Sequence, residues 1–395
     1  MISHMNIGQF GEAFIPIYDG VGRVMKAYAD TMAKRGHDVY VIAPMYDAGF
    51  RGQYPYEIVD YLSFKFSHKL PYRVGLKHLD PHFIQRLKQI DLDICHVHGP
   101  VFAGHIGLSY AKKKHVPIVG SFHTKFYDDI LEVTKSKQIA KTGAKMVASF
   151  YSQCDEVWAV TQSAGDTLRE YGYKGEIIVM PNGTDRRVLK SSLIPSVKEK
   201  YHIKENVPML LYVGQINWKK NLKCLIETCG LLKKKGFSTF QLVLAGQGPD
   251  MDGVKKLANS CGLEDMTIFT GHLQNFDELD CLYYLSDLFF FPSIYDTSSL
   301  VLREAASQHT PTLVVENTAA AEVIVDMKNG LTAPEDENKL SDKIISYFAS
   351  TEEEKKRIGD EAYKTIPLPW DGELMDSILS RYSDLIEKYK GKRIY

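Results

Sequence analysis

Short β-rich runs alternate with helical patterns over the first half of this chain, and this rhythm limits the fold more than any other feature. The β-rich runs are residues 6–10, 39–43, 94–97, 117–121 and 156–160. Between them, helical patterns span 22–35, 104–114 and a long stretch that ends at Phe150. Strand, helix and strand in this order favour a parallel sheet with helices on both faces.

The rhythm breaks once and then restarts. The break follows the run 177–183 and lasts through a polar, charged interval to about Pro208. New β-rich runs then occur at 209–214, 241–246, 267–271, 288–291 and 312–315. A chain of 395 residues is also too long for one ordinary core. We therefore predict an α/β protein with two Rossmann-like, doubly wound domains, 1–186 and 187–369, followed by a helix within 370–395.

Composition and charge exclude several classes of function. The formal net charge is -1, so no overall attraction to nucleic acid is expected. The six cysteines form no C-x-x-C pair and no signal peptide precedes them, so we expect a reducing cytoplasm. No apolar run approaches the roughly 20 residues that span a bilayer, and any membrane association is therefore expected to be peripheral.

One region departs from this balance of charge. Between Lys65 and Lys145 there are 14 Lys or Arg but only 6 Asp or Glu. An anionic acceptor or an anionic membrane surface would suit such a basic patch, and an ordinary solvated surface is the alternative.

The helical stretch that ends at Phe150 carries a lysine face and an apolar face. The lysines are 137, 141 and 145, and the apolar residues are Ile139, Met146, Val147 and Phe150. The pattern predicts a helix that packs its apolar face on the core and leaves its lysines in water. Docking on anionic lipid is the alternative.

Asp296 and Glu304 follow the β-rich run 288–291 and lie where a loop would turn into a helix. A carboxylate there can accept hydrogen bonds from sugar hydroxyls, and the N–H groups of a helix start can bind phosphates. The combination favours a site for a sugar nucleotide. The alternative is that Asp296 caps a helix and Glu304 lies on its exposed face.

Three histidines lie at strand ends of the first domain. His96 and His98 share one face at strand spacing, and His123 follows the next β-rich run. Zinc is disfavoured, because no further ligand is evident and no HExxH sequence occurs. We predict no metal site.

The order of several motifs resembles the retaining GT-B glycosyltransferases of family 4, also called glycosyl transferases group 1. Asp296 and Glu304 match the glutamate-x7-glutamate signature of that family, with Asp296 in place of the first glutamate. The segment 211–222 resembles its diphosphate-gripping strand, loop and helix. The resemblance implies two domains that face a central cleft, with the last helix crossing back to the first domain.

The resemblance implies that the second domain binds the donor. Lys220 matches a lysine that grips the diphosphate, whereas Gln215 stands where the family has arginine, with Lys219 and Arg303 nearby. Asp296 would then bind the donor sugar and Glu304 the ribose. The other implied donor contacts are Gly246, Gly248, Leu273, Ser298, Ser299, Leu300 and Val301, of which the two serines stand where the family has Phe and Gly.

The resemblance extends to the first domain. Residues 16–23 resemble a glycine-rich loop in which Gly20 contacts the donor and Asp19, which replaces a glycine, contacts a hydroxyl or simply begins a turn. His123 lies in a Phe-His-Thr sequence and is expected at the transferred sugar. Residues 123–129 are similar to a segment of diacylglycerol glucosyltransferases, and Lys125 is expected at the acceptor.

The implied activity is transfer of a sugar to an acceptor hydroxyl with retention, without a metal and without a cofactor beyond the donor substrate. UDP-glucose is the default donor, and a glycan or lipid is the acceptor. His123, Asp296 and Lys220 would carry the chemistry in a cytoplasmic protein that contacts the inner face of the membrane. The rivals are a soluble acceptor, a GT-B epimerase and an inactive sugar-nucleotide-binding partner, which Gln215, Asp19 and the Thr318-Ala319 pair in place of Gly-Gly motivate.

Overall fold

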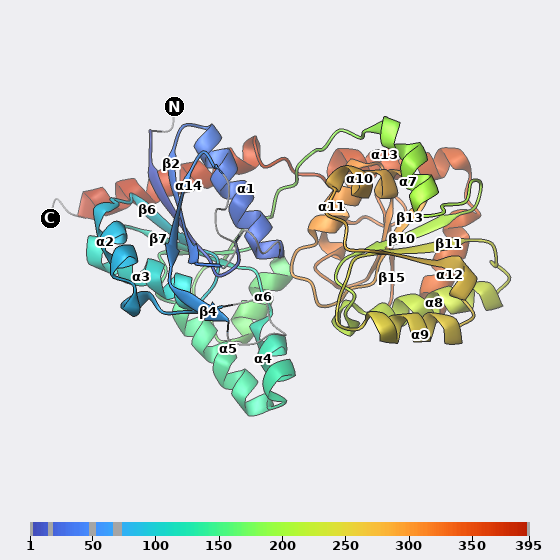
Figure 1. Cartoon of the computed structure of the whole chain (residues 1–395), viewed down its shortest axis with the longest axis horizontal. Helices are drawn as coiled ribbons and strands as arrows, with labels where there is room; N and C mark the ends of the chain where they lie inside the picture. The colour runs from blue at the N-terminus through green and yellow to red at the C-terminus, as the bar shows by residue number, and fades with distance from the viewer. Residues whose placement is uncertain (1–2, 15–18, 47–52, 66–72, 393–395) are drawn as a thin grey trace. The chain divides into compact units, whose positions relative to one another are not determined.

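The computed structural model describes residues 3–14, 19–46, 53–65 and 73–392 of the chain. These residues form two compact units (Figure 1). The first comprises Met1–Gly183 together with Pro369–Tyr395, and the second comprises Thr184–Leu368. Among the described residues, no helix is both long and apolar enough to cross a membrane.

The first unit is built on a parallel sheet of seven strands in the order β3-β2-β1-β6-β7-β8-β9. The strands are β1 (Asn6–Phe10), β2 (Asp38–Pro44), β3 (Glu57–Tyr61), β6 (Ile94–Val97), β7 (Ile118–Phe122), β8 (Glu156–Ala159) and β9 (Ile178–Val179). The order reverses between β1 and β6, and ligands of such sheets bind beyond the carboxyl ends of the strands at this reversal.

Helices and a small hairpin surround this sheet. The helices are α1 (Gly20–Lys34), α2 (Pro81–Gln89), α3 (Phe102–Lys114), α4 (Phe126–Thr134), α5 (Lys137–Tyr151), α6 (Gln162–Glu170), α14 (Glu373–Lys392) and the 3-10 turn η1 (Lys77–Leu79). The antiparallel hairpin joins β4 (Ser63–Lys65) and β5 (Arg73–Gly75). The sequence pattern did not predict β3, β4, β5 or α2.

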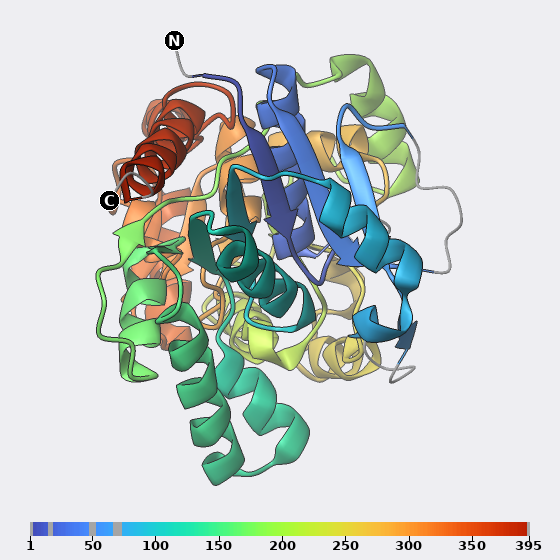
Figure 2. The same ribbon diagram turned by 90° about the vertical axis from the view of Figure 1, so that its left-hand side faces the viewer.

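The long helical stretch predicted to end at Phe150 is two helices. Lys135 adopts a left-handed backbone, with φ of 54°, which ends α4 and reverses the chain before α5 begins. The two helices form a pair that projects beyond the sheet of its unit in both views (Figure 1 and Figure 2).

The second unit repeats the plan with a parallel sheet of six strands in the order β12-β11-β10-β13-β14-β15. Its strands are β10 (Met209–Val213), β11 (Gln241–Ala245), β12 (Thr267–Gly271), β13 (Leu288–Phe291), β14 (Thr312–Val315) and β15 (Leu331–Ala333). The order reverses between β10 and β13. The prediction of two Rossmann-like, doubly wound domains is confirmed.

Strands β10, β11, β13 and β14 are buried on both faces, as their near-continuous apolar runs require, whereas the edge strand β12 is only partly buried. Its helices are α7 (Ile194–Lys200), α8 (Leu222–Lys234), α9 (Met251–Ser260), α10 (Phe276–Leu285), α11 (Leu300–Ser307), α12 (Glu337–Phe348) and α13 (Glu352–Thr365). Short 3-10 turns join them: η2 (Ser191–Leu193), η3 (Trp218–Lys220), η4 (Glu264–Met266) and η5 (Ala321–Val323).

Helix α14 packs on the first unit although it follows the whole second unit in sequence. Tyr382 is fully buried and stacks on Trp158 of β8, with ring centroids 5.7 Å apart. Arg381 donates two hydrogen bonds to Glu156, at 3.0 and 3.1 Å. The last helix is therefore part of the core of the first unit.

Helix α3 lies unusually close to the loop that follows β6, and a glycine makes this approach feasible. A Cβ atom on Gly104 would lie 2.0 Å from the carbonyl oxygen of Gly99, a backbone atom that cannot rotate away. The loop carries His98, so this packing also positions one of the candidate site residues.

We predict that Gly104→Ala destabilises the protein by about 2 kcal/mol or more, because the added methyl overlaps backbone. Alanine ordinarily stabilises a helix relative to glycine by about 1 kcal/mol. A decrease in the free energy of unfolding of Gly104→Ala would therefore point to the overlap with backbone. Gly391→Ala in α14 is the matched control, since a Cβ there would meet nothing within 4 Å. Urea unfolding of both variants is the measurement, and a neutral Gly104→Ala would contradict the packing described.

Candidate functional site

The two loops that follow β10 and β13 meet at the strand-order reversal of the second unit. Lys220 ends the turn η3 after β10, and Asp296 lies in the loop after β13. The Lys220 Nζ atom donates to Asp296 Oδ1 at 2.6 Å, and both side chains are 19% exposed. The structure therefore brings together the two residues predicted to bind the donor diphosphate and the donor sugar.

The ring of Tyr295 brings a second ammonium group, that of Lys219, close to this pair. The Nζ atoms of Lys219 and Lys220 lie 5.1 and 5.3 Å from the centroid of its ring, which is cation-π distance. Two ammonium groups thus gather over one aromatic face beside one carboxylate. Such a balance favours an anionic ligand. By contrast, Arg303 donates to the carbonyl of Ile366, and burial lowers its pKa to about 10.

The loop after β13 leads into α11 with several polar atoms unsatisfied. Helix α11 begins at Leu300, and the side chain of the cap residue Ser299 makes no capping hydrogen bond. Among the described residues, the Oγ atoms of Ser293 and Ser299 and the Oδ2 atom of Asp296 are buried without a hydrogen-bond partner. Buried polar atoms are normally paired, so this cluster indicates a place for a polar ligand.

The predicted phosphate-binding amides lie at this same helix start. The N–H groups of the first helical turn have no acceptor inside the helix, and they carry the positive end of the helix dipole. Ser298, Ser299 and Val301 are partly buried and Leu300 is buried. The alternative that Asp296 caps the helix is wrong, because the cap is Ser299.

Glu304 is buried inside the second unit, at 2% exposure. It accepts a hydrogen bond from Tyr283 at 3.2 Å, and its Oε1 atom lies 3.7 Å from Arg187 Nη1. Arg187 in turn donates two hydrogen bonds of 2.7 Å to Asp280. The alternative that Glu304 lies on an exposed helix face is wrong, and a network of two carboxylates and one guanidinium holds it in place.

The glycines predicted at the donor site serve loop packing. Gly246 has φ of 149°, and a Cβ atom there would lie 1.8 Å from the carbonyl oxygen of Gly214. A Cβ atom on Gly248 would lie 2.1 Å from the carbonyl oxygen of Ile216. Gln215, between these contacts, is exposed, and its backbone carbonyl accepts from Tyr212 at 3.1 Å.

Two cavities open at the carboxyl edge of this sheet. One, of about 720 Å³, is lined by Gln247, Gly248, Met251, Lys255, Phe269, Thr270 and Gly271. Leu273, one of the predicted donor contacts, is partly buried just beyond it and packs on the core. The edge strand β12 thus borders a space of ligand size.

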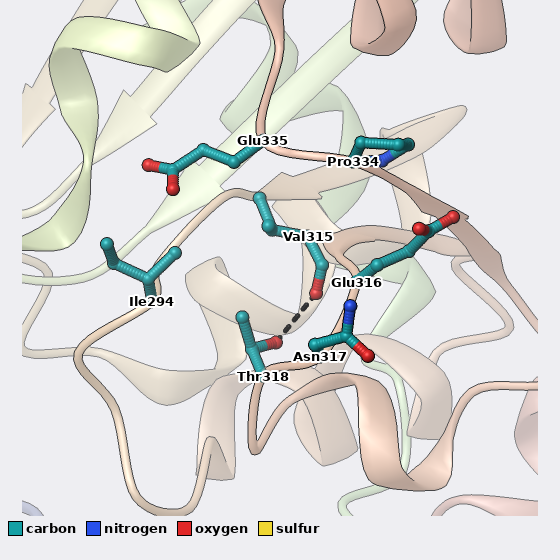
Figure 3. Close-up of a pocket in the computed structure, with 7 residues that line it drawn as sticks. All are labelled: Ile294, Val315, Glu316, Asn317, Thr318, Pro334 and Glu335. Atoms are coloured by element: carbon teal, nitrogen blue, oxygen red, sulfur yellow. Dashed lines mark hydrogen bonds between the residues drawn. The ribbon is translucent and has the colours of Figure 1, made fainter.

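The other cavity, of about 360 Å³, is lined by Ile294, Val315, Glu316, Asn317, Thr318, Pro334 and Glu335 (Figure 3). Thr318 donates to the carbonyl of Val315 at 2.7 Å and so fixes the turn after β14. Glu335 accepts from Asn221, the neighbour of Lys220, at 2.8 Å. This acidic pocket therefore adjoins the Lys220 loop through Asn221.

In the first unit, the three histidines gather at the carboxyl ends of β6 and β7. The rings of His96 and His98 stack with centroids 4.3 Å apart, and those of His98 and His123 stack at 5.4 Å. His98 Nδ1 lies 3.2 Å from His123 Nε2. Burial lowers the pKa of all three, to about 4 for His123, so they are neutral at pH 7.

These histidines are bound to protein groups. His96 hydrogen bonds to Tyr382 and Ser121, and His98 hydrogen bonds to Gln9 and His123. Among the described residues, no group of three or more His, Cys, Asp or Glu side chains is arranged to hold a metal ion.

The remaining predicted residues of the first unit lie at helix starts. Asp19 is the cap of α1, where its Oδ1 atom accepts from Gly22 N at 2.7 Å, and Gly20 is the first residue of that helix. Lys125 is partly buried at the start of α4. Residues 16–18 of the predicted glycine-rich loop lie outside the described residues.

The predicted packing of the α5 helix is wrong in part. Val147 and Phe150 are buried as expected, but Ile139 is 52% exposed and Met146 is 69% exposed. Val133 of α4 is 70% exposed. Lys137, Lys141 and Lys145 are all exposed, so the α4–α5 pair presents apolar and basic side chains together.

Sequence reasoning missed Glu12, which follows β1. It accepts hydrogen bonds from the Ala103 N–H, at the start of α3, and from the Tyr61 hydroxyl at 3.2 Å. Burial raises its pKa from 4.5 to about 7. Its place at the carboxyl end of a central strand was the available signal. Gln9 and Tyr295 were missed because their partners are distant in sequence.

Two family models match the chain. Residues 18–188 match the model described as Glycosyltransferase Family 4, and residues 194–365 match the model described as Glycosyl transferases group 1. Together the matches cover the larger part of both structural units.

Two curated relatives match over most of their own length. The chain is 26% identical over 338 residues to an alpha-monoglucosyldiacylglycerol synthase of Streptococcus pneumoniae, covering 82% of this chain and 74% of the relative. It is 25% identical over 338 residues to an alpha-monoglucosyldiacylglycerol synthase of Acholeplasma laidlawii, covering 83% and 84%.

A solved structure of Anabaena Alr3699/HepE in complex with UDP and glucose has the same fold. The superposition gives a TM-score of 0.69 with 17% identity and covers 99% of each chain. The two chains therefore share a fold over nearly their whole length.

We predict that Glu12 makes the free energy of unfolding fall as the pH rises from about 4.5 to about 7. Its pKa is higher in the folded state than the ordinary 4.5, so the folded protein keeps a proton that the unfolded chain releases between these values. Its stabilising contribution is present below about pH 4.5 and lost by about pH 7. Glu12→Gln should therefore stabilise the protein more at pH 8 than at pH 5, measured by urea unfolding. Glu170→Gln, at an exposed site, is the control, and an equal effect of Glu12→Gln at both pH values would refute the prediction.

Proposed function

We propose that this chain, which belongs to the GT-B glycosyltransferases of family 4 and group 1, transfers a hexose from a nucleoside diphosphate to a hydroxyl of a membrane glycolipid or lipid. The family membership and the GT-B fold are as the sequence resemblance implied. The observation that carries the proposal is the Lys220–Asp296 pair, whose carboxylate keeps one buried oxygen unpartnered beside the start of α11.

Lys220 and the N–H groups at the start of α11 are proposed to hold the donor diphosphate. Charge builds up on this leaving group as the bond to the sugar breaks, so preorganised cations and dipoles there stabilise the transition state. Lys219, which shares the Tyr295 ring with Lys220, supplies the second positive charge that Gln215 cannot.

The ion pair with Lys220 suggests how Asp296 would become available to bind the donor sugar. A diphosphate that binds Lys220 competes with Asp296 for the ammonium group, and the carboxylate is then available to accept hydrogen bonds from the hydroxyls of the sugar. Donor binding would thus rearrange one short contact of 2.6 Å rather than a whole loop. Ser293 and Ser299, whose hydroxyls are unpartnered, lie in the same segment.

The rest of the donor is assigned to neighbouring groups. Glu304 would accept from the ribose hydroxyls, and the cavity of about 720 Å³ bounded by Gly248 and Gly271 would receive the base, with Leu273 at its margin. Gly246 shapes the adjoining loop. In the first unit, His123 and Gly20 would approach the transferred sugar, and Asp19 and Lys125 the acceptor.

We infer a retaining, metal-independent reaction, in which the departing phosphate oxygen takes the proton of the attacking hydroxyl on the same face of the sugar. Lys220 is the cation that would replace a metal at the diphosphate. Neither a cofactor nor a metal is required by these roles.

UDP-glucose is the proposed donor. The Streptococcus and Acholeplasma relatives are both named for alpha-monoglucosyldiacylglycerol synthesis, and the Anabaena structure holds UDP and glucose. The relatives also favour a lipid acceptor over a soluble saccharide, because their named product is a glucosylated diacylglycerol.

The α4–α5 pair is the proposed contact with the cytoplasmic face of a membrane. Its exposed Val133, Ile139 and Met146 are flanked by the exposed lysines 137, 141 and 145. Apolar groups beside cations are the combination that anionic lipid surfaces attract. A protein that modifies lipids would gain substrate access from such a contact.

Mass spectrometry of donor and acceptor tests the proposal. The protein is incubated with UDP, GDP and ADP sugars, with and without a membrane lipid extract, and with and without EDTA. Consumption of UDP-glucose in EDTA with appearance of a lipid heavier by one hexose is expected. Donor conversion without any acceptor would instead indicate an epimerase, and binding without consumption an inactive partner protein.

We predict that Lys220→Ala lowers kcat/KM, because a charge-assisted contact to the leaving diphosphate is lost. The decrease should correspond to a loss of about 2 to 3 kcal/mol of transition-state stabilisation. Lys223→Ala is the matched control, since its side chain is 69% exposed on the next helical turn. Steady-state kinetics of both variants decide the matter, and an unchanged kcat/KM for Lys220→Ala would exclude the assigned role.

We predict that replacing Lys137, Lys141 and Lys145 by Gln weakens binding to vesicles of anionic lipid by roughly a hundredfold, at about 1 kcal/mol per lysine. Lys174, Lys204 and Lys256, which are exposed elsewhere, are replaced by Gln as a control with the same change of charge. Vesicle sedimentation is the measurement, and equal losses in both triple variants would show that the α4–α5 pair is not the docking element.

A further inference from the structure

The edge strand β12 contains a bulge where it borders the larger cavity of the second unit. Phe269 pairs with Leu244 of β11, and Gly271 pairs with the next residue, Ala245, so Thr270 is an extra residue in the strand. Consecutive side chains of an unbroken strand point to opposite faces of a sheet, and a bulge re-aims one of them. Phe269 and Thr270 accordingly both line the cavity of about 720 Å³.

The walls of this cavity suit a flat ring. Phe269 and Met251 supply apolar surface, and both are partly buried. Gly248 lines the same cavity, and a Cβ atom there would lie 2.1 Å from the carbonyl oxygen of Ile216. The absence of a side chain at this position lets a ligand approach the backbone closely. Apolar walls beside bare backbone are suited to a nucleobase.

Lys255 of α9 supplies a hydrogen-bond donor. Its Nζ atom lies 5.4 Å from the centroid of the Phe269 ring, which is cation-π distance. An ammonium group donates and cannot accept, and its flexible stem keeps it within reach of a ring that stacks on Phe269 in its place. Among the residues that the structure describes, no Asp or Glu lines this cavity. The ammonium group therefore has no carboxylate of the cavity to neutralise it.

Thr270 supplies a hydrogen-bond acceptor. Its hydroxyl donates its single proton to the carbonyl of Gly271 at 3.0 Å, and that carbonyl also accepts from the Gly246 N–H at 3.0 Å. A hydroxyl has one proton and two lone pairs, so the Thr270 oxygen can only accept from a ligand while this bond is in place. Gln247 also lines the cavity, but its amide carries both a donor and an acceptor and does not discriminate.

Nucleobases form two classes according to the edge that carries their hydrogen-bonding groups. Uracil and guanine have a carbonyl oxygen next to a ring N–H, so they accept and then donate. Cytosine and adenine have an amino group next to a bare ring nitrogen, so they donate and then accept. The first pattern complements an ammonium group beside a hydroxyl oxygen, whereas the second sets donor against donor and acceptor against acceptor. Groups left unpaired in this way lose affinity.

We propose that Lys255 and Thr270 are specificity-determining residues that select a keto base, uracil or guanine, against an amino base, cytosine or adenine. The inference rests on the function proposed above, which assigns the base to this cavity, and it names the residues that read that base. Lys255 is exposed, so water competes with it. The expected preference is therefore that of one hydrogen bond, about tenfold in the dissociation constant.

Titration calorimetry of the full chain with UDP, CDP, GDP and ADP tests the selection. UDP and CDP differ only in the edge described above, and GDP and ADP repeat the comparison on a larger ring. UDP should bind about tenfold more tightly than CDP, and GDP more tightly than ADP. Equal affinities within a pair, or tighter binding of the amino member, would overturn the proposal.

Lys255→Met tests the donor. Methionine keeps an unbranched apolar stem without the ammonium group, so the preference for UDP over CDP should fall close to one, chiefly through weaker binding of UDP. Lys256→Met is the matched control, because Lys256 is the exposed neighbour in the same helix and does not line the cavity. Equal weakening of UDP and CDP by both variants would show a general effect of charge and overturn the role of Lys255.

Thr270→Val tests the acceptor. Valine keeps the shape of the side chain and removes the oxygen, so the ratio of UDP to CDP affinity should again decrease. Thr267→Val in the same strand is the control, since the Thr267 hydroxyl donates to the carbonyl of Leu263 and does not line the cavity. A ratio that Thr270→Val leaves unchanged would overturn the assignment of Thr270.

The same titrations distinguish a failure of this inference from a failure of the proposed function. If none of the four diphosphates binds, the sugar-nucleotide site of the second unit is refuted and the base selection with it. Binding without a keto preference would overturn the base selection alone and leave the proposed transfer standing. The affinity ratios need neither an acceptor nor turnover.

Discussion

The reversal of strand order in each sheet is the constraint on which the rest of the structure depends. Parallel strands deliver their carboxyl ends to one edge, and the loops diverge to opposite faces only where the order reverses. In the second unit this point brings Lys220 beside Asp296, although 76 positions separate them. In the first unit it brings Gln9 to His98. The candidate chemistry therefore follows from topology before any side chain is considered.

The same physics explains why the candidate residues of the two units differ in character. The second unit gathers cations over Tyr295 and leaves helix N–H groups without internal acceptors, which suits an anion. The first unit gathers neutral, buried imidazole rings that are hydrogen-bonded to uncharged groups and packed against Tyr28.

The alternation of runs predicted both sheets, because the strands of a parallel sheet are continuous apolar segments and their periodicity is local. The pairing of Lys220 with Asp296 was within reach through their places at strand ends. The burial of Glu304 and the exposure of Ile139 were not, because helical periodicity shows which residues share a face but not what covers that face. The end of α4 at Lys135 and the hydrogen-bond partners of Gln9 depend on tertiary packing, which local sequence patterns do not reveal.

The place of helix α14 has a consequence for biosynthesis. Tyr382 is bonded to His96, and Trp370 packs against Tyr28 in the core of the first unit. A ribosome makes residues 369–392 only after the entire second unit, so the second unit can complete its fold on the emerging chain while the first, although made earlier, must wait. Until then the faces of Trp158 and Tyr28 lack their cover. The part of the chain that is translated first is thus the last to reach its native core, and its exposure to chaperones and proteases is set by the time needed to translate its neighbour.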